Sequence, residues 1–202
     1  MINPTQERIA VLVMAAGQSS RFGGCKLLAD IGGKPLLAHS ITCAQTSALG
    51  DTFVVTGRWH QEIAQWLGHQ SDITVQLLRN PNWQQGLGGS IAYGVKELAD
   101  RYDGILIMLA DQIGLTPQDL QALHNAKDGR DIACAAYNNR RGAPALFGHS
   151  CFSALQQLEG DQGAKQLLYH SDFGIAELPC SNAALDIDTP ADITHWQNSL
   201  RG

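Results

Sequence analysis

Short apolar segments alternate with longer segments of helical periodicity along the chain. The apolar runs are typical of strands buried on both faces of a sheet, because their hydrophobic residues are nearly continuous. We predict strands over Ile9–Met14, Thr52–Thr56, Thr74–Leu78, Ile105–Leu109, Ile132–Tyr137, Pro144–Phe147 and Gly174–Leu178. We predict helices over Pro35–Thr46, Gln61–Leu67, Gly88–Ala99, Pro117–Ala126, Cys151–Leu158, Ala164–His170 and Pro190–Ser199. This alternation indicates an α/β fold with helices on both faces of the sheet.

Two of the predicted helices begin at the same signal. Thr116-Pro117 and Thr189-Pro190 each place a threonine, a good N-cap, before a proline at the first helical position. The chain shows no linker, low-complexity run, charge block or internal repeat. We therefore predict one domain over residues 1–202, which is long enough to bury a substantial core.

The composition excludes several functional classes. Hydrophobic residues make up 44% of the chain and charged residues 16%, as in ordinary globular proteins. A net charge of −5 argues against a nucleic-acid-binding surface. The sequence has neither an 18-residue apolar run nor a signal-peptide pattern at its start. We therefore predict a cytoplasmic protein that binds neither nucleic acid nor membrane.

The cysteines and histidines do not form a metal-binding pattern. The five cysteines are scattered without a C-x-x-C pair, which favours reduced thiols, and the seven histidines show no paired spacing. Cys25 lies beside Lys26, so a lowered thiol pKa and a plain spacer position are both open. No G-x-S-x-G nucleophile motif occurs.

A polar, glycine-rich loop follows the first predicted strand. Its small, polar and charged residues include Ala15, Ala16, Gly17, Ser19, Arg21 and Lys26. A strand that leads into such a loop, at the carboxyl edge of a sheet, is typical of a phosphate-binding site. The spacing excludes both the G-x-G-x-x-G dinucleotide motif and the P-loop. The residues alone fit either a phosphate site or an ordinary turn with chance cations.

A second glycine-rich segment extends from Asn80 to Ser90 and also follows a predicted strand. Gly86 permits close approach of the backbone, and the free N–H groups of the next helix could serve an anion or a nucleobase edge. The segment equally fits a loop with an ordinary helix cap. Trp83 fits a hydrophobic plug or a stacking platform for a base.

Carboxylates follow a buried strand and precede the last helix. Asp111 comes directly after the apolar run that ends at Leu109 and Ala110, and fits either a turn cap or a ligand for Mg²⁺ beside a triphosphate. Asp186 and Asp188 are two residues apart, so an extended backbone would place both on one face. Asp192, in the first turn of the last predicted helix, is better explained by the helix dipole.

Two further segments carry polar and small residues. Arg140 to Phe147 reads R-R-G-A-P-A-L-F and includes Gly142 and Pro144. Glu159 begins the segment E-G-D-Q-G-A-K, in which Asp161 fits a helix N-cap or a binding residue.

In this order, the segments resemble the motifs of the molybdopterin nucleotidyltransferase family. The quoted patterns are A-A-G-x-S-x-R-x-G-x-x-K, N-P-x-W-x-x-G-x-x-x-S, A-D-Q, R-G-x-P with G-D-x-G-A, and D-I-D-T-P. The short gap from Arg21 to Lys26, with no proline before the lysine, is more similar to the molybdopterin branch than to the sugar-phosphate branch. The resemblance implies a Rossmann-like, three-layer α/β/α nucleotidyltransferase with a mostly parallel sheet.

The resemblance also implies a reaction and a role for each candidate residue. CMP from CTP would be joined to the phosphate of molybdopterin, pyrophosphate would leave, and Mg²⁺ would be the cofactor. The implied catalytic residues are Arg21, Lys26 and Asp111, and the implied metal ligands are Asp111 and Asp188. The implied nucleotide contacts are Ala15, Ala16, Gly17, Ser19, Arg21, Lys26, Asn80, Gly86 and Ser90, and the implied acceptor contacts are Gly142, Pro144 and Asp161. A molybdoenzyme or its maturation chaperone would be the protein partner.

Several alternatives stay open at this point. Ala15-Ala16 stands where the guanylyl branch has two glycines, which favours CTP over GTP. A transferase of the same fold could instead use GTP or another phosphorylated acceptor, such as a sugar or polyol phosphate. A non-catalytic carrier or chaperone of the molybdenum cofactor is also open, because Ile113 stands where the family usually has proline. The failed G-x-G-x-x-G spacing disfavours an NAD-dependent oxidoreductase.

Overall fold

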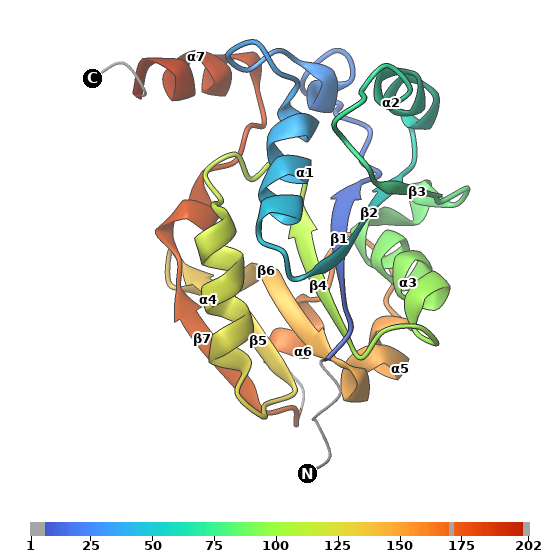
Figure 1. The fold of residues 1–202 in the computed structure, drawn as a ribbon, viewed down its shortest axis with the longest axis vertical. Coiled ribbons are helices and arrows are strands. Elements are labelled where there is room, and N and C mark those ends of the chain that lie inside the picture. Colours follow the sequence, from blue (N-terminus) through green and yellow to red (C-terminus); the bar gives the residue numbers. More distant parts are fainter. Residues whose placement is uncertain (1–6, 170–171, 200–202) are drawn as a thin grey trace.

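The apolar segments pair into one seven-stranded sheet in the computed structural model, which describes residues 7–169 and 172–199 (Figure 1). The strands are β1 (Ile9–Ala15), β2 (Gly50–Thr56), β3 (Gln76–Arg79), β4 (Gly104–Leu109), β5 (Ile132–Tyr137), β6 (Arg140–Gly148) and β7 (Ile175–Pro179). Their order is β3-β2-β1-β4-β6-β5-β7. β6 is antiparallel to both of its neighbours and the other pairs are parallel, which confirms a mostly parallel sheet.

Helices cover both faces of this sheet, as α1 and α4 in front of the strands and α5 and α6 behind them illustrate (Figure 1). The helices are α1 (Leu36–Thr46), α2 (His60–Leu67), α3 (Gly86–Leu98), α4 (Pro117–Lys127), α5 (Phe152–Leu155), α6 (Lys165–Tyr169) and α7 (Pro190–Ser199). One apolar core contains buried residues of α1, α2 and α4, and a second contains those of α3, α5 and α6. The two separate cores confirm the three-layer arrangement. They also hold it together, because each fully buried leucine or isoleucine contributes about 1.5–3 kcal/mol.

Some predicted boundaries were wrong. β6 begins at Arg140 rather than Pro144, because residues 140–142 pair with the end of β5 in a hairpin. The edge strand predicted from Thr74 begins only at Gln76 and runs on to Arg79. The helix predicted over Cys151–Leu158 is α-helical only over α5, after a 3₁₀ turn. His170 lies outside the described residues.

The parallel strands place the candidate residues at one edge of the sheet. β1, β2, β3 and β4 run in the same direction, so their carboxyl ends meet there. The loop after β1, the loop between β3 and α3 and the turn after β4 all begin at this edge. Within the described residues, no helix is long and apolar enough to cross a membrane.

A capping box fixes the start of α4. Thr116 Oγ1 accepts a hydrogen bond from the Asp119 backbone N–H at 3.2 Å, and Asp119 Oδ2 accepts one from the Thr116 backbone N–H at 2.9 Å. Asn182 Nδ2 also donates to Asp119 Oδ2 at 2.9 Å, so the same carboxylate ties α4 to the segment before α7. The Thr-Pro helix start thus also connects distant parts of the chain.

Asp119→Ala is expected to lower the free energy of unfolding by about 1–2 kcal/mol, because the carboxylate half of the capping box and the tie to Asn182 are both lost, while the Thr116 hydroxyl still caps the helix. Burial alone would raise the pKa of Asp119, but hydrogen bonds from Asn182 and Thr116 outweigh it and hold the pKa below its usual value. The stabilisation is therefore present above the unfolded-state pKa, ~3.9, and is lost as the pH falls through the folded-state pKa.

Urea unfolding at pH 7 and pH 3 checks this prediction. The difference between the wild type and Asp119→Ala should be largest at pH 7 and smaller at pH 3. Gln118→Ala is the control, since Gln118 is exposed on the same helix. A difference that grows on acidification contradicts the assignment.

Candidate active site

A cleft of about 560 Å³ opens at the carboxyl edge of the sheet. The loop after β1 lines one part of it with Ala15, Ala16, Gly17, Gln18, Ser19, Ser20, Arg21 and Lys26. The end of β4 and the turn after it, the segment that leads into α3 with the start of that helix, the turn before α6 and the segment before α7 contribute further polar and apolar residues of the lining, which include Leu109, Ala110, Asp111, Trp83, Gln84, Gly86, Leu87, Ser90, Asp161 and Asp188. Four of the sequence segments predicted to bind nucleotide or metal thus meet in one cavity.

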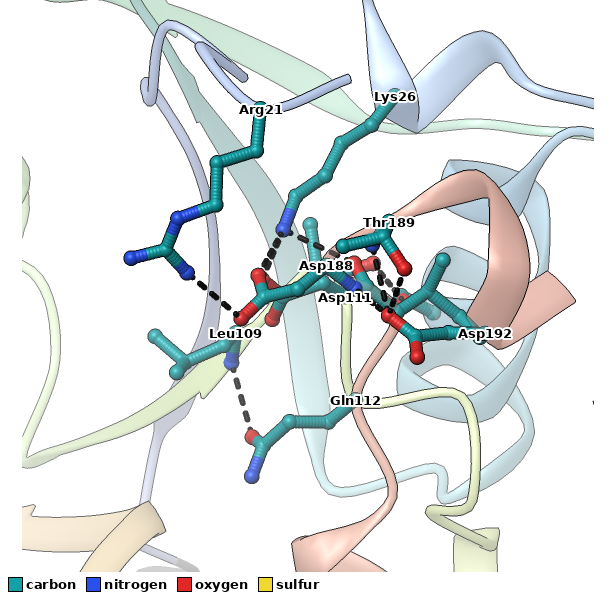
Figure 2. A network of polar contacts seen from close by, with 11 residues as sticks. Arg21, Lys26, Leu109, Asp111, Gln112, Asp188, Thr189 and Asp192 are labelled. Carbon is teal, nitrogen blue, oxygen red and sulfur yellow. Dashed lines mark hydrogen bonds and ion pairs between the residues drawn. The ribbon is translucent and has the colours of Figure 1, made fainter.

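The ammonium group of Lys26 lies between two carboxylates (Figure 2). Lys26 Nζ is 2.7 Å from Asp111 Oδ2 and 3.0 Å from Asp188 Oδ1, and it donates to the Ile187 carbonyl at 3.0 Å. Burial alone would lower the pKa of Lys26, but the charges and hydrogen bonds of Asp111 and Asp188 outweigh it and raise the pKa. Lys26 is therefore a permanent cation between the two predicted metal ligands.

Backbone hydrogen bonds fix the position of Asp111 relative to Asp188. The Asp111 carbonyl accepts from the Ile113 N–H at 2.9 Å and from the Ile187 N–H at 3.0 Å. Ile113 is buried in the core. Its N–H, which a proline would lack, donates the hydrogen bond that closes the turn. The turn after β4 therefore forms with isoleucine at this position and is joined to the residue that precedes Asp188.

Asp192, at the start of α7, fixes the backbone at Asp188. Asp192 Oδ2 accepts from the Asp188 N–H at 3.0 Å and from the Thr189 N–H at 2.7 Å (Figure 2). These hydrogen bonds, from Thr189 foremost, lower the pKa of Asp192. Asp192 lies in the first turn of α7, where the helix dipole was expected to favour it, and its side chain also caps the start of the helix and contacts Asp188 beside the cleft.

The donor set fits a divalent cation with hard oxygen ligands. Asp111 Oδ1 is buried and has no hydrogen-bond partner, although its other oxygen contacts Lys26. Burial, followed by the negative charges of Asp111 and Asp188, raises the pKa of Asp186, so a third carboxyl group lies in their field. Within residues 7–169 and 172–199, no group of three or more His, Cys, Asp or Glu residues is placed to hold a metal. Mg²⁺ does not require one, because it combines one or two carboxylates with phosphate oxygens and water.

Arg21 is the second cation of the loop and is far more exposed than Lys26. Its Nη1 lies 3.6 Å from Asp188 Oδ2, and its side chain is 77% exposed against 14% for Lys26. An exposed pair at this distance contributes little to stability, so Arg21 is free to turn toward an anion.

Of the two predicted nucleotide contacts Asn80 and Ser90, one lines the cleft and the other does not. Ser90 lines the cleft, whereas Asn80 is buried behind it and is absent from the lining. Asn80 Nδ2 donates to Ser90 Oγ at 3.1 Å, and Asn80 Oδ1 accepts from the Asn82 N–H at 2.9 Å. The geometry therefore gives Asn80 a supporting position, in which it orients the Ser90 hydroxyl.

The turn at residues 159–161 packs closely against the start of α3. Gly88 N–H donates to the Gly160 carbonyl at 2.7 Å. Gly86 has a φ of +84°, and a Cβ there would lie 2.3 Å from Asp161 Oδ1 and 2.6 Å from the Gly160 carbonyl oxygen. Asp161, predicted as an acceptor contact, therefore lies beside Gly86, predicted as a nucleotide contact.

The other two predicted acceptor residues lie on β6 and do not line the cleft. Gln112, to which the sequence assigned no role, connects β6 to the cleft. Its Nε2 donates to the Ala143 carbonyl at 2.8 Å, between Gly142 and Pro144, and to the Ala183 carbonyl at 2.9 Å. Its Oε1 accepts from the Leu109 N–H (Figure 2). The available sequence signal was a polar glutamine directly after Asp111 and directly before the apolar Ile113.

The cysteine beside Lys26 is not activated. Burial raises the pKa of the Cys25 thiol, so the alternative of a lowered pKa is wrong. Cys25 packs against the core below the loop, and Lys26–Leu28 forms a 3₁₀ turn directly after it. Cys25 therefore has the spacer position, and the turn directs Lys26 into the cleft.

Comparison with known sequences shows the family to which the chain is similar. A family model described as "MobA-like NTP transferase domain" matches residues 11–174. Purine catabolism protein PucB of Bacillus subtilis is 30% identical over 190 residues, which cover 89% of this chain and 91% of PucB. Bifunctional protein GlmU of Polaromonas naphthalenivorans is 32% identical over 83% of this chain, but the chain spans only 35% of its length.

Solved structures share the fold over nearly the whole chain. The homologue of Mycobacterium tuberculosis Rv0371c from Mycobacterium sp. strain JC1 has 27% identity and a TM-score of 0.79, over 96% of this chain and 97% of that chain. The manganese complex of M. tuberculosis Rv0371c has 23% identity and a TM-score of 0.76, over 95% and 99%. Molybdopterin-guanine dinucleotide biosynthesis protein A of Archaeoglobus fulgidus has 14% identity and a TM-score of 0.67, over 95% and 98%.

Proposed function

This chain belongs to the MobA-like NTP transferase domain family, and we propose that it transfers CMP from CTP to the terminal phosphate of a molybdopterin-type acceptor. The observation that carries the proposal is the meeting of Lys26 with Asp111 and Asp188 in a cleft lined by the glycine-rich loop. In the proposed reaction, an acceptor phosphate oxygen forms a bond to the α-phosphorus. The bond from that phosphorus to the β-phosphate oxygen breaks, and pyrophosphate leaves.

This chemistry needs no general base. A phosphate monoester has a second pKa near ~6, so the acceptor oxygen is already largely ionised at neutral pH. The absence of histidine from the cleft lining is consistent with this. The main barrier is electrostatic, because one anion must approach another, and the site has to supply positive charge where the phosphates meet.

Asp111 and Asp188 would hold the divalent metal in the proposed reaction. When bound, Mg²⁺ or Mn²⁺ would neutralise and orient the phosphates. Support comes from the partnerless buried oxygen of Asp111 and from the manganese complex of the mycobacterial neighbour. The backbone bonds between the turn after β4 and Ile187 keep the two carboxylates facing the same part of the cleft.

Arg21 and Lys26 would stabilise the charge that grows on the departing pyrophosphate. Arginine presents a planar fork of donors, and lysine a compact point charge, so the two residues have different tasks. Arg21 is exposed enough to follow the leaving group, while Lys26 lies deep beside the carboxylates. The N–H groups of the loop add further donors.

The choice of CTP and of molybdopterin rests on motif resemblance. Ala15 and Ala16 line the cleft where the guanylyl branch has two glycines, which supports CTP. The spacing from Arg21 to Lys26 and the molybdopterin-guanine dinucleotide protein of the same fold support the acceptor. A molybdoenzyme or its maturation chaperone would then receive the product.

Pyrophosphate release tests the proposal. Purified protein with Mg²⁺ and a molybdopterin-type acceptor is expected to release pyrophosphate with CTP and much less with GTP or ATP. Release with GTP alone would keep the reaction and overturn the assignment of the base. Release with CTP and a sugar phosphate, but not with molybdopterin, would overturn the acceptor. Acceptor binding without release from any nucleotide would favour the carrier.

A further inference from the structure

All three donors of the Lys26 ammonium group are in use. They contact Asp111 Oδ2, Asp188 Oδ1 and the Ile187 carbonyl, at 2.7–3.0 Å. A lysine side chain has three N–H donors and no acceptor, so this set is complete. In this state Lys26 has no donor left for a phosphate, although its position in the loop sequence implies phosphate binding.

The ammonium group occupies one oxygen of each carboxylate that would hold a metal, and of the Asp111 carboxylate it leaves Oδ1 without a hydrogen-bond partner. Mg²⁺ binds oxygen ligands at ~2.0–2.1 Å, and a cation this close to Asp111 and Asp188 would face the Lys26 charge across a few ångströms. The pair is largely shielded from water, since the side chains of Lys26 and Asp111 are only 14% and 21% exposed. Repulsion between the two cations is therefore weakly screened on the Asp111 side, and this disfavours a metal on the two carboxylates while Lys26 stays between them.

We propose that Lys26 is an internal counter-ion that keeps the Asp111–Asp188 site closed to a divalent metal until a triphosphate draws the ammonium group away. This inference rests on the proposed function, because it takes the two aspartates as the metal ligands and a nucleoside triphosphate as the competing anion. Lys26 thus has two alternative positions, one on the carboxylates and one on the phosphates. Metal and nucleotide then bind cooperatively, and each raises the affinity for the other by the same factor.

The formal charges explain why the metal requires the nucleotide. Among the groups in direct ion pairs, Asp111 and Asp188 carry two formal negative charges, which Lys26 and the nearby Arg21 balance. A divalent metal arriving alone adds two positive charges to this balanced set. A triphosphate brings the compensating negative charge and offers Lys26 and Arg21 new partners, so the metal can take the carboxylates without unpaired cations beside it.

Mn²⁺ binding measured by electron paramagnetic resonance tests this inference without turnover. In the absence of nucleotide, Lys26→Gln is expected to bind Mn²⁺ between about 5- and 150-fold more tightly than the wild type. Lys34→Gln removes the same charge from an exposed position outside the cleft and should bind Mn²⁺ like the wild type. Adding Asp188→Asn to Lys26→Gln should remove the gained affinity, because a metal ligand is then lost. Equal or weaker Mn²⁺ binding by folded Lys26→Gln overturns the inference.

The wild type provides a second measurement that does not depend on the variant. A non-hydrolysable CTP analogue is expected to increase Mn²⁺ affinity, and the increase should be much smaller in Lys26→Gln. An equal increase in both proteins, or none in the wild type although the analogue binds, contradicts the inference. The pyrophosphate assay separates the two proposals, because a protein with the expected Mn²⁺ behaviour and no release leaves the counter-ion role intact and refutes the transfer reaction.

Discussion

Asp111→Asn is expected to reduce nucleotidyl transfer by at least about 10²–10³-fold while the protein stays folded. Asparagine has nearly the same shape, but it lacks the negative charge that would hold the metal and pair with Lys26. The ties that fix this turn run through the Asp111 backbone carbonyl, which the substitution keeps. Lys26 also retains Asp188 and the Ile187 carbonyl, so its ammonium group keeps two of its three contacts.

Initial rates of pyrophosphate release and thermal unfolding by circular dichroism check this prediction together. Asp100→Asn is the matched control, because Asp100 is an exposed aspartate with no place in the cleft. It should keep wild-type activity. Substantial activity of Asp111→Asn in the presence of Mg²⁺ would refute the metal assignment, whereas a large loss of melting temperature would show that Asp111 has a structural role.

Gly86→Ala is expected to disturb both stability and nucleotide binding. The backbone at Gly86 has a φ of +84° and a ψ of −171°, a region essentially restricted to glycine, and occupying it with another residue costs about 1–3 kcal/mol. The added Cβ would also lie 2.6 Å from the Gly160 carbonyl oxygen, which is backbone and cannot turn aside. The turn that carries Asp161 must therefore move away from α3.

A fall in melting temperature of several degrees is expected from the backbone strain. CTP affinity is expected to fall at least tenfold, about 1.4 kcal/mol, because Gly86 and the displaced Asp161 both line the cleft. Isothermal titration with CTP measures the second. Gly68→Ala is the control, because a Cβ at Gly68 would meet only ordinary contacts at 3.5 Å and φ there is negative. Unchanged CTP affinity in folded Gly86→Ala would show that the 159–161 turn does not shape the nucleotide site.

The sequence allowed the architecture to be predicted because strand identity depends on local apolar runs. β1 and β4 are nearly uninterrupted hydrophobic segments, and both were recognised close to their true bounds. The first half of β6 was missed because Arg140, Arg141 and Gly142 have no strand pattern of their own. They are extended because they pair with β5, and pairing across a hairpin is not encoded in one short segment.

The site was predictable only in part, because many of its contacts join segments that are far apart in the sequence. Residues at strand ends, such as Asp111 and the glycine-rich loop, could be assigned to the same edge from topology alone. The position of Lys26 between Asp111 and Asp188 could not, because it depends on contacts between segments far apart in the chain. The same holds for Asn80, whose side chain supports Ser90 from behind the cleft. Motif matching names residues, but it does not say which of them face the ligand.

The contact between Lys26 and Asp188 has a consequence for how the protein is made. These partners are separated by 162 positions, and the second belongs to the segment that leads into the last helix. At about 5–20 residues per second, the ribosome needs roughly ten to thirty seconds to add Asp188 after Lys26. During that interval the emerging lysine lacks this partner, so a nascent chain that has already formed β1 and its loop carries an uncompensated cationic loop. The loop therefore gains its Asp188 partner only after nearly the whole chain has been synthesised.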